Sequence, residues 1–161
     1  MCAEAREPTT DGGIWNDPEI SAAVEKARNG QTREIMGLTH KIKPRSSWEP
    51  ERKYLPRYYE CLGTNENPMV QMFAVEAVRR LKDKSSVEPL QKFVMTAQRR
   101  LQGAALSRED FGMVQIALQA AIGVLGEIDG DNELSVSFLG TLLKHDVSKE
   151  WGGAVAHSAL A

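Results

Sequence analysis

The sequence is short of aromatic and cysteine residues, and each shortage excludes a class of structure. Aromatic residues make up 6% of the 161 positions, whereas Ala and Leu are plentiful, and this composition favours closely packed helices over a β-sheet. Two cysteines, Cys2 and Cys61, are too few for a disulfide framework. We therefore expect an all-α fold in which Cys61 is a free, buried thiol.

Long apolar runs are also missing. No run approaches the roughly 20 apolar residues that cross a bilayer, and residues 1–13 lack the hydrophobic stretch of a signal peptide. The sequence as written therefore predicts a soluble chain without a transmembrane segment, and a cytoplasmic location is favoured. Cys2, directly after Met1, would also suit a mature exported lipoprotein whose signal peptide had been replaced by Met.

The chain has no excess of positive charge. It carries 20 Lys and Arg against 22 Asp and Glu, a formal net charge of -2. A dedicated nucleic-acid binder has a strongly basic balance, so nucleic acid is not the expected partner.

Motifs of known catalytic and metal sites are lacking too. The three histidines have no His or Cys at ligand spacing, and HExxH, GxSxG, P-loop and GxGxxG motifs are absent. The acidic segment 129–133 has neither the turn glycine nor the later glutamate of an EF-hand loop. The sequence therefore predicts no catalytic residue, no metal site and no cofactor.

Helical spacing of apolar residues organises the rest of the chain. Residues 1–15 have little to bury and predict a flexible, disordered tail, and residues 16–161 predict a single helical domain. Pro18 and Pro68 suit first helical positions, while Asn29 and Gly30 suit a helix end. The expected helices span about 18–29, 32–42, 51–62, 68–81, 87–101, 109–128, 134–143 and a last stretch that contains 151–160.

These helices pair into hairpins that repeat. The pattern of small and aliphatic residues at 70–81 recurs 47 residues later at 117–128, and again 35 residues later at 152–160. We explain the longer offset by an insertion around Gln102 to Ser107, between the two helices of one hairpin.

The repeated pattern, together with Leu125-Gly126-Glu127-Ile128 and Tyr54-Leu55-Pro56-Arg57, resembles HEAT-like repeats. The resemblance is strongest over 51–161. It implies an α-α superhelix, an α-solenoid of the armadillo-like kind, with about four stacked hairpins. Because the sequence stops within an apolar helix, we expect further repeats or another subunit to cover the last hairpin.

Two groups of residues are candidates for binding a protein partner. The first is a basic and aromatic segment that suits polyanions or acidic peptides, although its tyrosines also fit an inward-facing stripe, the interpretation that we favour. The second is a set of polar residues on the second helices, which line the concave side of such a solenoid. The candidates are Lys41, Lys43, Arg45, Trp48, Arg52, Lys53 and Arg57 in the segment, and Gln71, Arg79, Gln115 and Gln119 on the second helices.

The function predicted by this resemblance is a non-enzymatic interaction or scaffold module. The alternative is an enzyme or enzyme accessory on the same scaffold, because HEAT-like families include bilin lyases and alkyl-base DNA glycosylases. A glycosylase would need a basic groove with a positioned carboxylate, which Arg79 and Arg80 alone scarcely supply.

Overall fold

The computed structural model describes residues 18–42, 50–63, 66–103, 106–130 and 137, and every regular element in those ranges is helical. This confirms the all-α class. In chain order the elements are α1 (Pro18–Arg28), α2 (Arg33–Lys41), the 3-10 turn η1 (Arg52–Tyr54), α3 (Leu55–Cys61), α4 (Pro68–Leu81), the 3-10 turn η2 (Lys84–Ser86), α5 (Val87–Gln102) and α6 (Arg108–Asp129). The predicted tail, 1–15, lies outside the described residues, as does the predicted fourth hairpin, 134–160, apart from residue 137.

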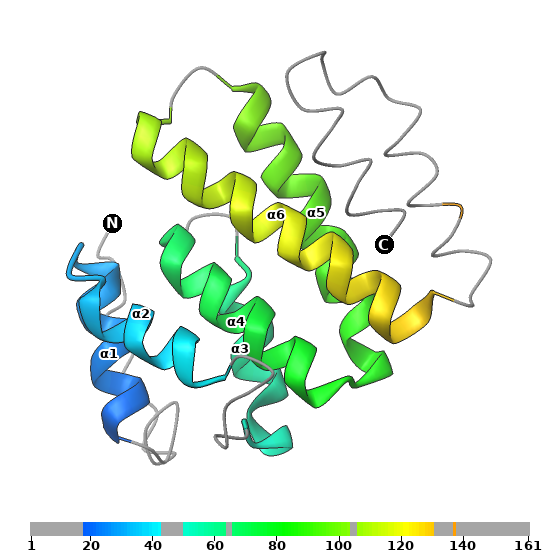
Figure 1. Ribbon diagram of the computed structural model, residues 1–161, viewed down its shortest axis with the longest axis horizontal. Coiled ribbons are helices and arrows are strands. Elements are labelled where there is room, and N and C mark those ends of the chain that lie inside the picture. Colours follow the sequence, from blue (N-terminus) through cyan, green and yellow to red (C-terminus); the bar gives the residue numbers. More distant parts are fainter. Residues whose placement is uncertain (1–17, 43–49, 64–65, 104–105, 131–136, 138–161) are drawn as a thin grey trace, which may run out of the picture.

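Consecutive helices pair into hairpins, and the second helix of each hairpin belongs to a common layer. Helix α1 packs on α2, α3 on α4 and α5 on α6, while α4 also contacts both α2 and α6. In Figure 1 the helices α2, α4 and α6 run side by side in the same direction, with α4 in the middle. The described chain therefore has one layer built from second helices, and α4 is its centre.

The central position of α4 explains its sequence. Helices α2, α3 and α6 surround it, so it buries side chains on most of its circumference. Small residues on both partners, such as Ala74 and Ala77 on α4 and Ala117 and Ala121 on α6, are fully buried and allow the two backbones to approach closely. The small residues that the repeat pattern singled out are thus core residues.

Local signals set the helix ends. Pro68 is the first residue of α4, and the side chain of Asn67 caps that helix by accepting a hydrogen bond from the Met69 amide at 2.9 Å. Ser107 caps α6 in the same way through the Asp110 amide at 3.0 Å. Gly30 follows α1 with a φ of +85°, a conformation that glycine adopts without steric cost, as the predicted helix stop required.

The predicted insertion between the helices of the third hairpin is wrong. The connection between α5 and α6 spans 103–107, and it is no longer than the connection between α3 and α4, which spans 62–67. The extra residues are in the helices themselves, because α5 and α6 have 16 and 22 residues whereas α3 and α4 have 7 and 14. Helical apolar spacing continues through these longer stretches, so the backbone stays helical.

A polar junction attaches the first hairpin to the second. The Asn67 side-chain amide donates to the Ala27 carbonyl at 3.0 Å, at the C-terminal end of α1. Beside it, the Arg28 guanidinium forms a forked ion pair with Glu66, at 2.8 Å for the shortest contact. Asn67 therefore serves two helices at once, since its oxygen caps α4 while its nitrogen binds the end of α1.

Candidate interaction surface

The basic residues of the predicted binding segment that the structure describes are each held in an ion pair. The pairs are Lys41 with Glu19 at 2.7 Å, Lys53 with Glu51 at 2.7 Å, Arg57 with Glu60 at 3.0 Å, and Arg52 with Asp83. A carboxylate thus balances each positive charge locally, and these four residues do not form an uncompensated basic groove. Lys43, Arg45 and Trp48 lie outside the described residues.

The ionised forms of two of these pairs are favoured by hydrogen bonds. Ser85 donates from its hydroxyl and its amide to Asp83, and these bonds, helped by Arg52, lower the pKa of the Asp83 carboxyl. The hydrogen bond to Glu51 raises the pKa of the Lys53 ammonium. Both groups are charged at neutral pH even at their ordinary pKa values, and these shifts widen the pH range over which they stay charged.

The tyrosines of the segment face inward rather than outward. Tyr54 and Tyr58 are buried, and the Tyr58 ring meets Phe73 edge to face, with ring centroids 6.0 Å apart. Tyr59 is partly buried, and its hydroxyl hydrogen-bonds with Ser85 and Ser86 at 2.9 Å each. The favoured interpretation of the stripe is therefore confirmed, and these rings offer no platform on which bases could stack.

Gln71, expected to be exposed, is a buried structural residue with 1% of its surface accessible. Its amide nitrogen donates to the Gly63 carbonyl at 2.7 Å, and its oxygen accepts from Arg100 of α5 at 3.1 Å. The expectation of exposure was wrong because it assumed one solvent-facing side for α4, whereas α4 is covered on several sides. Gln71 joins the α3–α4 turn to α5.

The other three predicted residues of the second helices keep some exposure. Arg79 of α4 is held by Glu76 at 2.8 Å and lies 3.9 Å from Glu127 of α6. Gln115 and Gln119 of α6 are half-buried. Arg79 thus pairs mainly within α4 and makes only a longer contact with α6, while the two glutamines remain available at the surface.

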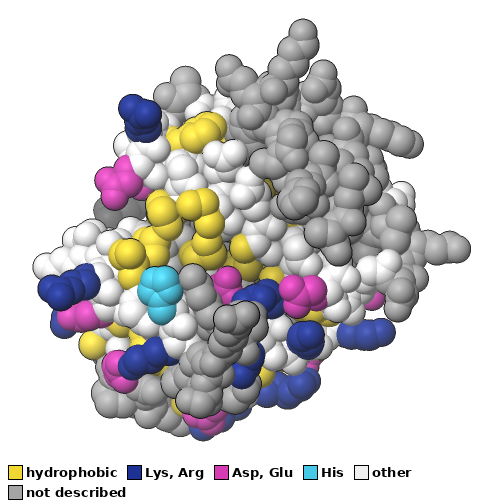
Figure 2. Space-filling model, viewed as in Figure 1, with side chains coloured by type: hydrophobic (Ala, Val, Ile, Leu, Met, Phe, Trp, Pro, Cys, Tyr) yellow, Lys and Arg dark blue, Asp and Glu magenta, His cyan; other side chains and the backbone are white. Residues whose placement is uncertain are grey.

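Two of the three exposed large hydrophobic side chains among the described residues lie on second helices. Among the described residues, the large hydrophobic side chains classed as exposed are Met36 of α2 at 44%, Met95 of α5 at 44% and Ile116 of α6 at 48%. Figure 2 shows hydrophobic side chains gathered over the region where Figure 1 places α2, α4 and α6. The sequence-based prediction missed this surface because it took only polar residues of the second helices as candidates. The sequence signal for it was an apolar residue that lies outside the buried stripe of its helix.

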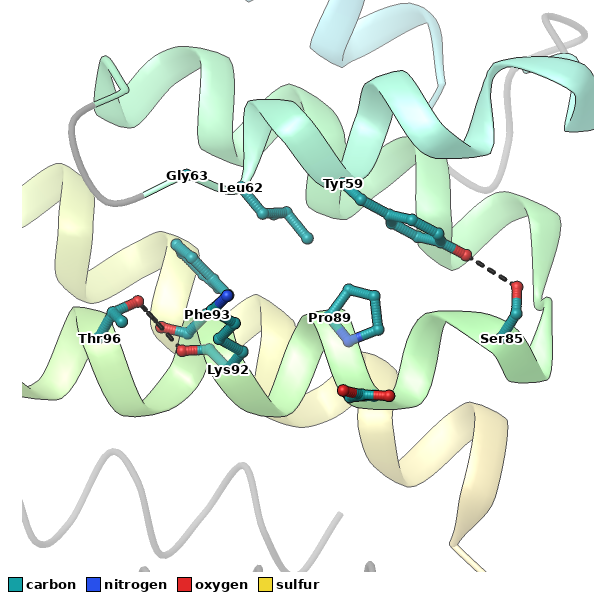
Figure 3. Close-up of a pocket in the computed structure, with 9 residues that line it drawn as sticks. Tyr59, Leu62, Gly63, Ser85, Pro89, Lys92, Phe93 and Thr96 are labelled. Atoms are coloured by element: carbon teal, nitrogen blue, oxygen red, sulfur yellow. Dashed lines mark hydrogen bonds between the residues drawn. The ribbon is translucent and has the colours of Figure 1, made fainter.

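A separate groove of about 410 Å³ lies between α3 and α5. Figure 3 shows Tyr59 and Leu62 on one side, with Pro89 and Phe93 on the other. Its lining includes one carboxylate, Glu88, and one ammonium, on Lys92. Among the described residues, the lining offers no pair of carboxylates, histidine or thiol, so we assign it no acid–base or nucleophilic chemistry.

Comparison with protein-family models, with curated proteins and with solved structures finds no match for the chain. Function must therefore be inferred from the surfaces and side chains of the described helices.

Metal binding and membrane insertion can both be assessed on those helices. Within the described ranges, no group of three or more His, Cys, Asp or Glu residues could hold a metal ion. Helix α6, with 22 residues, is long and apolar enough to span a membrane by length and composition alone. The core helix of a folded domain has the same composition, and α6 buries Val114, Leu118 and Ile122 while it packs against α4 and α5.

The thiol of Cys61 is buried and stays protonated at neutral pH, so it is a poor nucleophile. Burial, reinforced by the negative charge of Glu66, raises its pKa from 9.0 to about 12. The folded chain therefore retains this proton at pH values where the unfolded chain loses it, so alkaline pH favours unfolding. This shift yields a testable pH dependence.

Between pH 8 and pH 10 the wild-type chain should lose about 1 kcal/mol more unfolding free energy than a Cys61→Ala variant. Urea titrations at the two pH values measure this difference directly. Other groups that titrate at alkaline pH affect both proteins alike, so identical losses would show that burial does not hold the thiol protonated.

Proposed function

We propose that the chain is a non-enzymatic protein-interaction module built on HEAT-like repeats, and that its partner binds the layer of second helices. The contacts of α4 with α2 on one side and α6 on the other support this proposal, because second helices line the binding surface of helical solenoids. The proposal extends the arrangement of the described hairpins to a superhelix of about four.

The single observation that carries the proposal is the exposure of Met36 and Ile116 on two different helices of this layer. Exposed apolar side chains that gather on one surface are typical of interaction sites. Methionine adapts its shape to different partners, and α4 and α6 add the partly exposed Met69 and Met113. An apolar, adaptable surface of this kind suits a protein segment rather than a small charged ligand.

The surroundings of Ile116 favour it as the anchor of this surface. Gly112 and Ala120, each four residues from Ile116, are small, so these two neighbours on α6 cover little of the Ile116 side chain. Gln115 and Gln119 flank it and supply hydrogen-bonding groups without a net charge. The arrangement resembles the apolar centre and polar rim of a protein–protein interface.

A photo-crosslinking amino acid at position 116 tests the proposal, with position 95 as the matched control. Both native side chains are similarly exposed, but Met95 lies on α5, a first helix. We expect a crosslinked product that contains one partner protein when the probe is at position 116, and no such product when it is at position 95. Mass spectrometry of the product identifies the partner. The same products at both positions would contradict a site on the second helices.

The purified partner then allows a quantitative prediction. Ile116→Asp should weaken binding by about tenfold or more, because a carboxylate would be desolvated at the centre of the interface. Met95→Asp should leave the affinity within about twofold. Isothermal titration calorimetry measures both, and equal losses for the two variants would place the binding site elsewhere.

A further inference from the structure

A second groove, of about 420 Å³, runs between α1 and α2 on the first hairpin. Each helix contributes four residues to it. They are Glu19, Ala22, Ala23 and Lys26 from α1, and Glu34, Gly37, Leu38 and Lys41 from α2. The floor is apolar and made largely of small residues, and all four charged side chains stand at the rim.

The two walls of this groove repeat one sequence pattern. Residues 19–26 read EISAAVEK and residues 34–41 read EIMGLTHK, so each lining residue of α1 has its counterpart 15 positions later in α2. In both stretches a glutamate precedes a lysine by seven residues, which is two helical turns or about 10.5 Å.

Because the two helices pack against each other, the two glutamates and two lysines lie at the four corners of a square in which positive and negative charges alternate. Lys26 of α1 reaches Glu34 of α2 at 2.8 Å, and Glu19 reaches Lys41 at 2.7 Å, so the two ion pairs bridge opposite ends of the groove. Going around the rim, the signs run negative, positive, negative, positive. All four side chains are about half exposed or more, and they can also meet charges from outside.

Such a square is complementary to itself. Consider a second copy that docks on this face about a two-fold axis lying in the plane of contact, either parallel or perpendicular to the helices. At every corner, a carboxylate of one copy then meets an ammonium of the other. A two-fold dimer needs a patch that complements itself in this way. The small floor favours close approach, since Ala22 and Gly37 are exposed and Gly37 has no side chain.

We propose that the α1–α2 face is a self-association site, on which a second copy of this chain docks face to face. This site shares helix α2 with the proposed partner surface, but the groove is lined by neither Met36 nor Ile116. Because the rim charges are exposed, the contact is weak and depends on salt.

Sedimentation of the full chain over a concentration series tests the proposal. The mass should rise from 17.8 kDa towards twice that value as concentration increases. Raising the salt from about 0.1 M to about 1 M shortens the screening length from about 10 Å to about 3 Å, and association should weaken about tenfold. A monomer at every concentration in low salt would overturn the proposal.

A pair of glycine variants locates the contact. A Cβ at Gly37 or at Gly126 would meet nothing within 4 Å, so Gly37→Gln and Gly126→Gln should both fold, with equal or higher helix stability. Only Gly37→Gln places a side chain in the groove floor, and it should abolish the dimer. A dimer that survives Gly37→Gln unchanged would overturn the proposal, because another face or another segment of the chain would then be responsible.

Charge reversal tests the rim. Lys41→Glu brings two carboxylates together in either orientation of the dimer and should weaken association about tenfold. Lys53→Glu is the matched control, since Lys53 is also an exposed lysine in one ion pair but is not among the residues that line this groove. Equal effects of the two variants would attribute the change to net charge and overturn the proposal.

Discussion

Replacing Phe73 by alanine should lower the free energy of unfolding by about 3–5 kcal/mol. Phe73 lies on α4, the helix that contacts α2, α3 and α6, and its ring is fully buried against Tyr58. Deletion of the ring removes its hydrophobic contribution and leaves a cavity that the surrounding helices can only partly fill. A domain has a total stability of about 5–15 kcal/mol, so the variant should lose a large part of it.

Urea unfolding followed by far-ultraviolet circular dichroism measures this loss. Phe73→Leu, which keeps part of the volume, should lose markedly less. Met95→Ala removes an exposed side chain and should change stability by no more than about 0.5 kcal/mol. A loss below about 1 kcal/mol for Phe73→Ala, with an unchanged dependence on urea, would contradict the central role of α4.

Asn67→Ala should lower the free energy of unfolding by about 2 kcal/mol, an unusually large effect for a residue in a turn. Two losses combine: the cap on the Met69 amide, worth about 1 kcal/mol, and the hydrogen bond to the Ala27 carbonyl, worth about 1 kcal/mol. The second bond connects different hairpins, so its loss should also loosen the first hairpin.

Asn67→Asp separates the two contributions. The aspartate oxygen still caps α4, but it cannot donate to the Ala27 carbonyl, so this variant should lose only about half as much stability. Hydrogen exchange provides the spatial readout: amides of α1 should exchange faster in both variants, whereas those at the start of α4 should exchange faster only in Asn67→Ala. Equal behaviour of the two variants would mean that the contact between hairpins contributes nothing.

The helices themselves were predictable, because local signals determine them. Apolar residues at steps of three and four mark the stripes of α4, α5 and α6, and Pro68 and Gly30 mark a start and an end. The inward orientation of Tyr54 and Tyr58 followed from the same spacing. The candidate binding residues were harder to predict, because exposure depends on how many neighbours a helix has.

The sequence by itself determined the all-α class, the order of the helices and most of their apolar faces, since these depend on contacts between residues close along the chain. Only the tertiary structure decided that Gln71 is buried, that Asp83 neutralises Arg52, and that Ile116 is left uncovered. Each of these depends on which distant helix lies alongside, and periodicity within one helix carries no information about that neighbour.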